Sequence, residues 1–330
     1  MQDHSNTALP LDRRSVTAAI LEGPHDVVDA GATKLAHWRF GDGPDVVLVH
    51  GWPLHSATWR AIVPALAEHF TVHLFDLPGV GWSPPLTEQA TFDTHARALG
   101  AALATLGLAS YALVAHDSGA VITRLVAADN PRVWALVMGN TELPDHDAWQ
   151  VHAYVLATKV PGLAQWMMRA LRHGWLRRSP LAFGGCFADA RFHDLDAEFG
   201  ELFVRPLVAS ESVIEGQLAL VRGLDFATIR DLRRTHLRIG APALLVWGPD
   251  DPFFPIAKAR RTLEHFSGGA RLAEIPGKLF AHEEQPDAFC AHVEPFLVET
   301  INRQSSSSLS SSSSAGLKPT PLVCTATSLM

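Results

Sequence analysis

The sequence predicts an α/β protein whose central sheet is mostly parallel, flanked by helices and interrupted by a helical insertion. Short apolar segments bounded by Gly, Pro or Asp alternate with helical segments, which is typical of strands buried on both faces. The alternation stops between residues 143 and 238 and resumes at Pro242. With 47% hydrophobic and 18% charged residues among 330, the composition indicates a globular chain with a large core.

Seven segments have the pattern of strands. Residues 34–40, KLAHWRF, alternate apolar and polar side chains and suit an antiparallel strand at the edge of the sheet. Six continuous apolar runs are expected to form buried strands, at residues 45–50, 71–76, 111–116, 133–139, 242–248 and 270–277. Helical segments at residues 58–70 and 95–108 lie between the early runs, as the crossovers of a parallel sheet require.

The chain divides into four expected segments. Residues 1–142 and 239–304 form the two parts of the sheet domain, and residues 143–238 form a helical lid inserted between them. The lid is expected to contain helices at residues 147–159, 163–178, 194–209 and 211–224. Residues 305–330 begin with the serine-rich run SSSSLSSSSS, which cannot bury enough apolar area to offset chain entropy. This tail is therefore expected to be disordered, with the folded part ending near Gln304.

Composition also limits the partners. Lys+Arg 27 against Asp+Glu 34 gives a net charge of -7, which argues against nucleic-acid binding. The three cysteines are far apart, so they predict no disulfide framework and fit a reducing compartment. Without an apolar N-terminal run or a spanning segment, we expect a cytoplasmic protein with no membrane partner. Dinucleotide, P-loop and zinc motifs are absent, so we expect no cofactor and no metal. The sequence leaves the oligomeric state open.

One strand-to-helix turn has the pattern of a catalytic turn. A sharp turn of this kind needs small residues two positions before and two positions after its strained central residue. Centring the turn on Asp117 places Ala115 and Gly119 at these positions. Centring it on Ser118 places His116 there, and histidine is not small. Asp117 is therefore the expected nucleophile, while Ser118 contributes its backbone N–H. A plain turn whose Asp or Ser caps the helix is the alternative without chemistry.

Two further loops follow strands at the same edge of the sheet. Trp52, in the segment HGWP, can aim its backbone N–H at the site that the N–H of Ser118 also faces. Two such donors form an oxyanion hole. Asp251 follows the strand at residues 242–248, where the charge partner of a catalytic histidine would lie. Asp250 is the alternative for this role, and a helix cap is the structural alternative.

Together these segments resemble the α/β-hydrolase superfamily, over residues 30 to 300. The segments that carry the resemblance are HGWP (50–53), DLPGVGWS (76–83), AHDSGA (115–120) and WGPDDPFFP (247–255). An aspartate at the turn resembles the branch that contains epoxide hydrolases and haloalkane dehalogenases. The resemblance implies an α/β-hydrolase fold, an aspartate that forms an alkyl-enzyme ester, and a histidine-activated water that hydrolyses the ester.

The family pattern is broken where its catalytic histidine belongs, after the last strand. Alignment on Phe280 and on residues 283–286 places Leu279 at that position, and His282 three residues later. Either His282 acts as the base, paired with Asp251, or the protein does not complete hydrolysis. The order Asp117, Asp251, His282 is the order of this fold's triads.

The substrate-binding positions depart from the family as well. Haloalkane dehalogenases usually have Trp directly after the nucleophile, where this chain has Ser118. Epoxide hydrolases use two tyrosines of the lid, and here only Tyr154 is suitably placed. Trp149, Tyr154 and Trp166 are the residues of the lid expected to line an apolar pocket.

The leading hypothesis from the sequence is therefore a hydrolase that acts on a small apolar substrate resembling an epoxide or a haloalkane. Asp117 would be the nucleophile, and His282, oriented by Asp251, would activate water. Two alternatives stay open. The first is a serine esterase that uses Ser118, and the second is a binding protein that has lost turnover because of Leu279.

Overall fold

A computed structural model describes residues 11–188, 192 and 196–313. Its central sheet has the strand order β1-β2-β4-β3-β5-β6-β7-β8 within the described residues. The strands are β1 (Asp26–Asp29), β2 (Lys34–Phe40), β3 (Asp45–Val49), β4 (Thr71–Phe75), β5 (Tyr111–Ala115), β6 (Val133–Met138), β7 (Ala243–Trp247) and β8 (Ala270–Glu274). The pairs β1–β2 and β2–β4 are antiparallel, and the other neighbours are parallel. The predicted mostly parallel sheet is confirmed.

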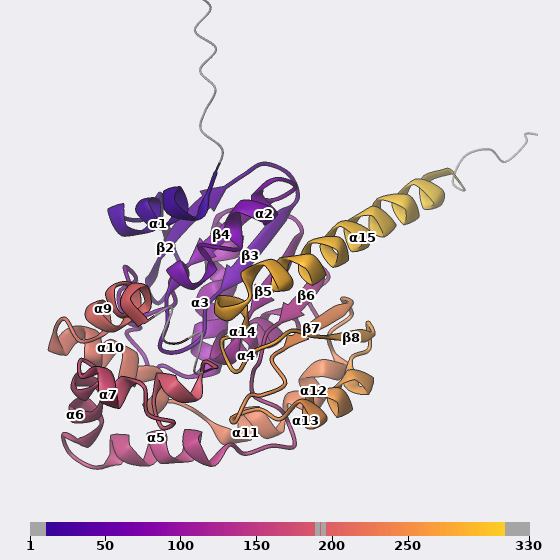
Figure 1. Cartoon of the computed structure of the whole chain (residues 1–330). Helices are drawn as coiled ribbons and strands as arrows, with labels where there is room; N and C mark the ends of the chain where they lie inside the picture. The colour runs from indigo at the N-terminus through magenta and orange to yellow at the C-terminus, as the bar shows by residue number, and fades with distance from the viewer. Residues whose placement is uncertain (1–10, 189–191, 193–195, 314–330) are drawn as a thin grey trace, which may run out of the picture.

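The helices of the sheet domain cover both faces of the sheet (Figure 1). They are α1 (Arg13–Glu22), α2 (Val63–Ala67), α3 (Phe92–Thr105), α4 (Asp117–Ala127), α13 (Ile256–Thr262), α14 (Ala281–Glu284) and α15 (Pro286–Ser313). Helices α3 and α4 pack on each other, while α15 packs on α2, β6 and β7. This double cover explains why every residue of β4, β5, β6 and β7 is buried, and why these strands read as continuous apolar runs.

Two elements near the N-terminus were not expected. Helix α1 begins after Asp12, whose side chain and that of Ser15 cap the helix reciprocally. Strand β1 pairs with β2, so β2 is antiparallel as predicted but is not the edge strand. The two-residue apolar pair in Asp26–Asp29 is too short to show a period, which is why the pattern did not reveal this strand.

Most of the insertion at residues 143–238 lies together, while its last helix lies beside α13 and packs on α4 of the sheet domain (Figure 1). Its described elements are helical apart from one isolated bridge. They are α5 (Trp149–Lys159), α6 (Leu163–Ala170), α7 (Gly174–Arg177), η2 (Phe183–Gly185), η3 (Gly200–Val204), α9 (Arg205–Leu207), α10 (Glu211–Arg222), α11 (Phe226–Arg230) and α12 (Leu232–Leu237). The segment expected as one helix at residues 163–178 is divided into α6 and α7. The helix expected at 194–209 lies partly outside the described residues.

Helix α10 is held firmly against the sheet domain. The indole Nε1 of Trp52 donates to the carbonyl of Gln217 at 2.9 Å, and the Gln217 amide donates to the carbonyl of Pro53 at 3.3 Å. A Cβ added at Gly216 would lie 2.4 Å from the carbonyl oxygen of Gly79. Only two glycines allow the backbones to approach this closely, so α10 and the loop after β4 are in direct contact.

The C-terminal helix is longer than expected. The tail was predicted to be disordered from residue 305. Helix α15 instead continues through Ser313, so the first part of the serine run extends this helix. Adding residues to an existing helix is far easier than starting one, which explains how serines can follow a packed helix. Figure 1 shows this end of α15 projecting away from the sheet. The rest of the predicted tail, residues 314–330, lies outside the described residues. In the described part, no helix combines the length and the apolar character needed to cross a membrane.

Candidate active site

Asp117 occupies the strained turn between β5 and α4. Its φ is 48°, a left-handed conformation that non-glycine residues rarely adopt. A Cβ added at Gly119 would lie 2.2 Å from the carbonyl oxygen of His50, so this position admits only glycine. The turn is thus centred on Asp117, as its small neighbours predicted, and it presents a carboxyl group at the carboxyl edge of the sheet.

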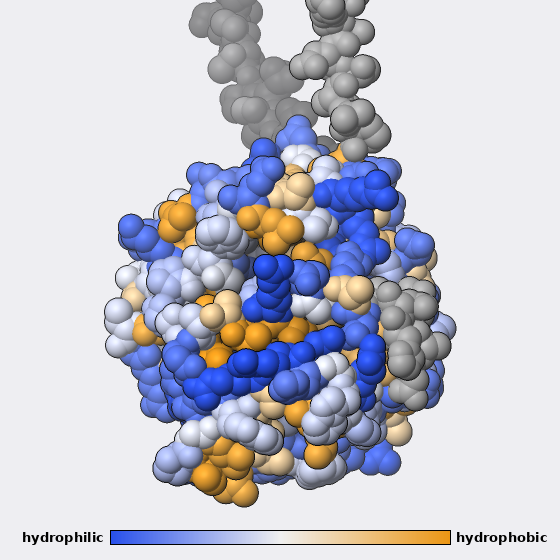
Figure 2. All heavy atoms as spheres, turned by 60° about the vertical axis from the view of Figure 1, so that its left-hand side comes forward, coloured by the Kyte–Doolittle hydropathy of each residue, from blue (hydrophilic) through white to orange (hydrophobic). Residues whose placement is uncertain are grey.

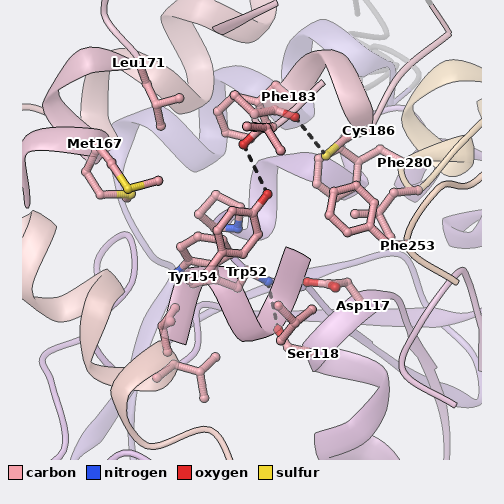
Figure 3. A pocket seen from close by; sticks show the side chains of 18 of the residues that line it. Trp52, Asp117, Ser118, Tyr154, Met167, Leu171, Phe183, Cys186, Phe253 and Phe280 are labelled. Atoms are coloured by element: carbon pink, nitrogen blue, oxygen red, sulfur yellow. Dashed lines mark hydrogen bonds between the residues drawn. The ribbon is translucent and has the colours of Figure 1, made fainter. Parts of the chain in front are cut away.

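A cavity of about 300 Å³ lies over this turn, between the sheet and the insertion. Asp117, Ser118 and Glu142 line its floor from the sheet domain. Its walls are mostly apolar and include Val151, Met167, Met168, Leu171, Phe183, Leu220, Phe253, Phe254, Leu279 and Phe280. Figure 3 shows Phe253 and Phe280 on the side of the pocket near Asp117, with Met167 and Leu171 on the opposite wall. The cavity therefore suits a small molecule with much apolar surface.

Two of the three predicted pocket residues line the cavity. Tyr154 and Trp166 do, and the Tyr154 ring lies 5.9 Å from that of Trp52 (Figure 3). The Tyr154 hydroxyl donates to the carbonyl of Leu181 at 3.2 Å, and burial raises its pKa, so it stays a donor. The prediction that Trp149 lines the pocket is wrong. This residue lies at the first position of α5 with 63% of its surface exposed, and it is not among the residues that line the cavity.

The predicted oxyanion-hole residues lie together beside Asp117. The backbone N–H of Trp52 donates to the hydroxyl of Ser118 at 2.9 Å (Figure 3). The backbone N–H groups of Ser118 and Trp52 also lower the pKa of the Asp117 carboxyl, so both are near it. In this state the Trp52 donor is used by the Ser118 hydroxyl. That hydroxyl would have to rotate or yield before the donor could bind a substrate oxygen.

Burial dominates the electrostatics of Asp117. Loss of solvent is the main cause that raises its pKa well above the ordinary value of 3.8. The neighbouring charge of Glu142 raises it further, and that of Asp251 adds a smaller effect. The two backbone N–H groups oppose these effects without cancelling them. The site thus holds several carboxyl groups close together in a poorly hydrated space.

Asp251 lies after β7, where an acidic partner was predicted. Its carboxylate accepts from the Asn140 amide at 2.8 Å and from the backbone N–H of Phe253 at 2.7 Å. Burial raises the pKa of Asp251 to about 7. The carbonyl of Asn140 in turn accepts from the backbone N–H of Asp117 at 2.7 Å. Asn140 therefore links the two acidic loops, and its place directly after β6 was the sequence signal that could have identified it.

His282, the predicted base, is hydrogen-bonded to Thr58 and not to Asp251 in this structure. Its Nε2 shares a hydrogen bond with the hydroxyl of Thr58 at 2.8 Å, and its ring lies 4.1 Å from that of His116. The side chain is buried and is not among the residues that line the cavity. Burial, followed by the charge of Arg60, lowers the pKa of His282 to about 3. The short helix α14 carries this residue into the core, where it is buried.

Leu279 lies on the cavity wall instead, at the position that the resemblance assigns to histidine. Its side chain is only 6% exposed. None of the described residues lining the cavity is a histidine, lysine or arginine. In the described part of the chain, no cluster of three His, Cys, Asp or Glu side chains could hold a metal ion.

Glu142 is the functional candidate that the sequence analysis missed. It follows β6, lines the cavity and is only 4% exposed. Its Oε2 accepts from the hydroxyl of Thr141 at 2.9 Å, and burial raises its pKa. A carboxyl group close to the carboxyl end of a buried strand was a signal available in the sequence.

The sequence also matches known proteins. A family model described as "alpha/beta hydrolase fold" matches residues 44–286. A pimeloyl-[acyl-carrier protein] methyl ester esterase from Chromobacterium violaceum is 32% identical over 266 residues, which cover 77% of this chain and 96% of that protein. The protein of the same name from Aeromonas hydrophila is 63% identical, but over only 46 residues, 14% of this chain and 18% of the relative.

Solved structures show the same fold. An ancestral haloalkane dehalogenase superposes with a TM-score of 0.68 at 22% identity, covering 84% of this chain and 98% of the other. At this identity the likeness supports the fold and leaves the activity open. The family model, in contrast, spans more than half of the sequence, including the turn at Asp117 and the loops at Trp52 and Asp251. The chain therefore belongs to the α/β hydrolase fold family.

Proposed function

We propose that this chain is a hydrolase whose Asp117 attacks an electrophilic carbon of a small, largely apolar substrate such as an epoxide or a haloalkane-like molecule. The observation that carries the proposal is the φ of 48° at Asp117, which places a carboxyl group at the tip of the turn below an apolar cavity. Strain of this kind costs about 1–3 kcal/mol and is concentrated at functional sites.

In the first step the Asp117 carboxylate forms a C–O bond to the substrate carbon, and the leaving group or the epoxide oxygen takes the electron pair. Tyr154 is the lid residue that would donate to that oxygen: its raised pKa keeps the hydroxyl protonated, and its proton would have to leave the carbonyl of Leu181 first. In the second step water attacks the ester carbonyl. The backbone N–H groups of Trp52 and Ser118, which lower the pKa of the Asp117 carboxyl, would stabilise the resulting oxyanion.

A serine esterase is the second candidate function, and the comparisons favour it over a dehalogenase. The relative that covers most of this chain is named as a methyl ester esterase. The Ser118 hydroxyl lines the cavity and accepts from the N–H of Trp52. Against this candidate, Asp117 and not Ser118 has the strained conformation, and among the described residues no histidine hydrogen-bonds to Ser118.

Labelling in H₂¹⁸O separates the candidates. Excess enzyme is incubated with panels of epoxides, haloalkanes and p-nitrophenyl esters, and its peptides are analysed by mass spectrometry. Heavy oxygen in the Asp117 carboxyl, absent in Asp117→Asn, is the expected result, because hydrolysis of the ester leaves the water oxygen on the enzyme. Labelling of Ser118 by a fluorophosphonate, with ester turnover lost in Ser118→Ala, would instead support the esterase. Tight binding of these ligands without turnover or label would support a binding protein.

A further inference from the structure

The cavity contains a nucleophile but lacks the usual base. Its described lining includes two carboxyl groups, those of Asp117 and Glu142, and no basic side chain. Leu279 occupies the wall, and His282 is held by Thr58 outside the cavity. Cys186 and Tyr154 also line the cavity, but burial raises the pKa of both groups, so they keep their protons. The carboxyl groups are therefore the remaining candidates for removing a proton from water inside this cavity. Asp117 is excluded while it is part of the ester, which leaves Glu142.

We propose that Glu142 is the general base that activates the water which hydrolyses the Asp117 ester. This inference rests on the proposed function. Strands β5 and β6 are parallel neighbours with Ala115 opposite Met138, so their carboxyl ends lie at the same edge of the sheet. Asp117 follows the first strand closely and Glu142 the second, and both reach the same cavity. The charge of Glu142 acts on Asp117, as expected for two acids that share a poorly hydrated space.

The hydrogen bonds around Glu142 allow it to gain and lose a proton. The hydroxyl of Thr141 lies 2.9 Å from Oε2 of Glu142 and 2.9 Å from the carbonyl oxygen of Asp117. A hydroxyl has one proton and can serve only one of these acceptors at a time. When Glu142 is protonated it can donate to the Thr141 oxygen, and the Thr141 hydroxyl then donates to the backbone carbonyl of Asp117. When Glu142 is ionised, Thr141 can donate to Glu142.

Arg124 holds Thr141 and Glu142 in this arrangement through two hydrogen bonds. Its Nη2 donates to the Thr141 hydroxyl at 2.8 Å, and its Nη1 donates to the carbonyl of Glu142 at 3.0 Å. The guanidinium is buried, and burial lowers its pKa to about 10, so it remains charged at neutral pH. Arg124 is thus a positioning residue for Glu142, because it binds the Thr141 hydroxyl and the Glu142 backbone.

The step is balanced in atoms and protons. Glu142 takes a proton from water while the oxygen of that water bonds to the ester carbon of Asp117. The oxyanion collapses, the bond from the carbonyl carbon to the alkyl oxygen breaks, and the alcohol leaves with the proton returned by Glu142. Forming the ester also removes the charge of Asp117, so that Glu142 ionises more easily once it is needed.

The test is a single-turnover experiment on the full chain with Glu142→Gln, using the epoxide or haloalkane that labels Asp117. Glutamine keeps the size but cannot accept the proton. We expect the adduct to form near the wild-type rate and its hydrolysis to slow by about 100-fold or more, so that intact mass spectrometry detects a lasting adduct. Glu142→Asp should recover part of the rate, and the pH dependence of adduct hydrolysis should be lost in Glu142→Gln.

His282→Gln is the matched control, since this residue lies outside the cavity. It should hydrolyse the adduct within about twofold of the wild-type rate, far from the effect of a lost base. The inference is overturned if the Glu142→Gln adduct is hydrolysed at the wild-type rate, or if the His282 variant alone accumulates it. If neither the wild type nor any variant forms an adduct on Asp117, the proposed function itself fails, which is a different result from normal adduct formation with unimpaired hydrolysis.

Discussion

Asp117 combines two conditions that reduce stability, a left-handed backbone and a buried carboxyl group. In the unfolded chain this carboxyl loses its proton near pH 4, whereas the folded protein keeps the proton to higher pH. Unfolding therefore releases a proton in this window, and the free energy of unfolding falls as the pH rises through it. Such groups usually persist because function requires them.

We predict that Asp117→Asn stabilises the protein, and more strongly at pH 8 than at pH 4. Asparagine tolerates the same backbone conformation and has no charge to bury. A gain of about 1–2 kcal/mol at pH 8 is expected from urea unfolding, the scale usual for single substitutions. Asp129→Asn is the matched control, because Asp129 also has a positive φ but is exposed and paired with Arg238. Its effect should stay within about 0.5 kcal/mol. A gain for Asp117→Asn that does not depend on pH would contradict the explanation.

Substitution of Leu279 tests whether a base on the cavity wall can reach the ester. Placing histidine there puts a base with an ordinary pKa near 6.5 on the cavity wall. In the Glu142→Gln background, Leu279→His should speed hydrolysis of the Asp117 ester by about 10-fold or more, within the range of general-base effects. Leu279→Ala in that background opens the same wall without adding a base. Equal rates for these two double variants would show that the wall position does not reach the ester.

For individual residues, the sequence was informative where sterics decide and weak where contacts between distant segments decide. The small neighbours of Asp117 identified the centre of the turn, because the backbone admits little else there. The fate of His282 depended on Thr58 and His116, which are 224 and 166 positions away in the chain. No local pattern could show that these residues would bind it in the core.

At the level of elements, the turn between β5 and α4 depends on one close backbone approach. A Cβ at Gly119 would meet the carbonyl oxygens of His50 and Val49, at 2.2 and 2.9 Å. These backbone atoms lie at the end of β3 and directly after it, and they cannot move without disturbing the loop at Trp52. Asp117 and the backbone N–H of Trp52 are thus positioned by the same contact.

We therefore predict that Gly119→Ala lowers the free energy of unfolding by about 1–3 kcal/mol, as overpacking does. It should also disturb the catalytic turn. Gly100→Ala is the control, because Gly100 lies inside α3 with open space around it, and this change should stabilise the helix by about 0.5–1 kcal/mol. Chemical denaturation of both variants provides the measurement. Equal tolerance of the two substitutions would show that the turn can relax.

The pattern of elements was predictable because strands that are covered by helices on both faces are apolar along their whole length. Each buried strand showed as an apolar run, and the ends of β3, β4, β5, β6 and β7 differ from the expected ends by one residue. The failures have local causes. The helix expected at residues 58–70 became a 3-10 turn (Ser56–Trp59) followed by α2, which has Pro at its beginning. The expected helix at residues 163–178 was divided where the chain turns before Gly174.

For the whole molecule, the core extends through α15 but ends before the serine run. Phe296, Leu297 and Thr300 are buried, and Ile301 packs against the core, whereas Ser306 of the serine run is exposed and its hydroxyl donates to the carbonyl of Asn302. We predict that a chain ending at Gln304 unfolds within about 0.5 kcal/mol of the full chain. A chain ending at Pro295 should lose several kcal/mol, because it lacks two large buried side chains. Thermal and urea unfolding of both truncations provide the measurement, and equal losses would contradict this boundary.

The cavity could be expected from the sequence only in outline. Its floor comes from loops after parallel strands, which the fold rule brings together. Its walls come from α5, α6, α10 and the segment around Phe183, and the way they enclose it depends on how the insertion folds back. On the face that carries α6, α7, α9 and α10, Figure 2 shows an apolar recess bordered by hydrophilic side chains.

The contact between α10 and the sheet domain limits how molecules can reach Asp117. Lifting α10 would break both hydrogen bonds of Gln217 and separate Gly216 from Gly79, and it would pull on the loop that carries the Trp52 N–H. Trp166 and Leu181, in contrast, both line the cavity and have more than half of their surface exposed, at 60% and 58%. Substrate should therefore enter, and product leave, on the side of α6 and the segment after α7, while α10 stays in place. Under the proposed function, product would then leave the cavity without displacing the backbone N–H of Trp52.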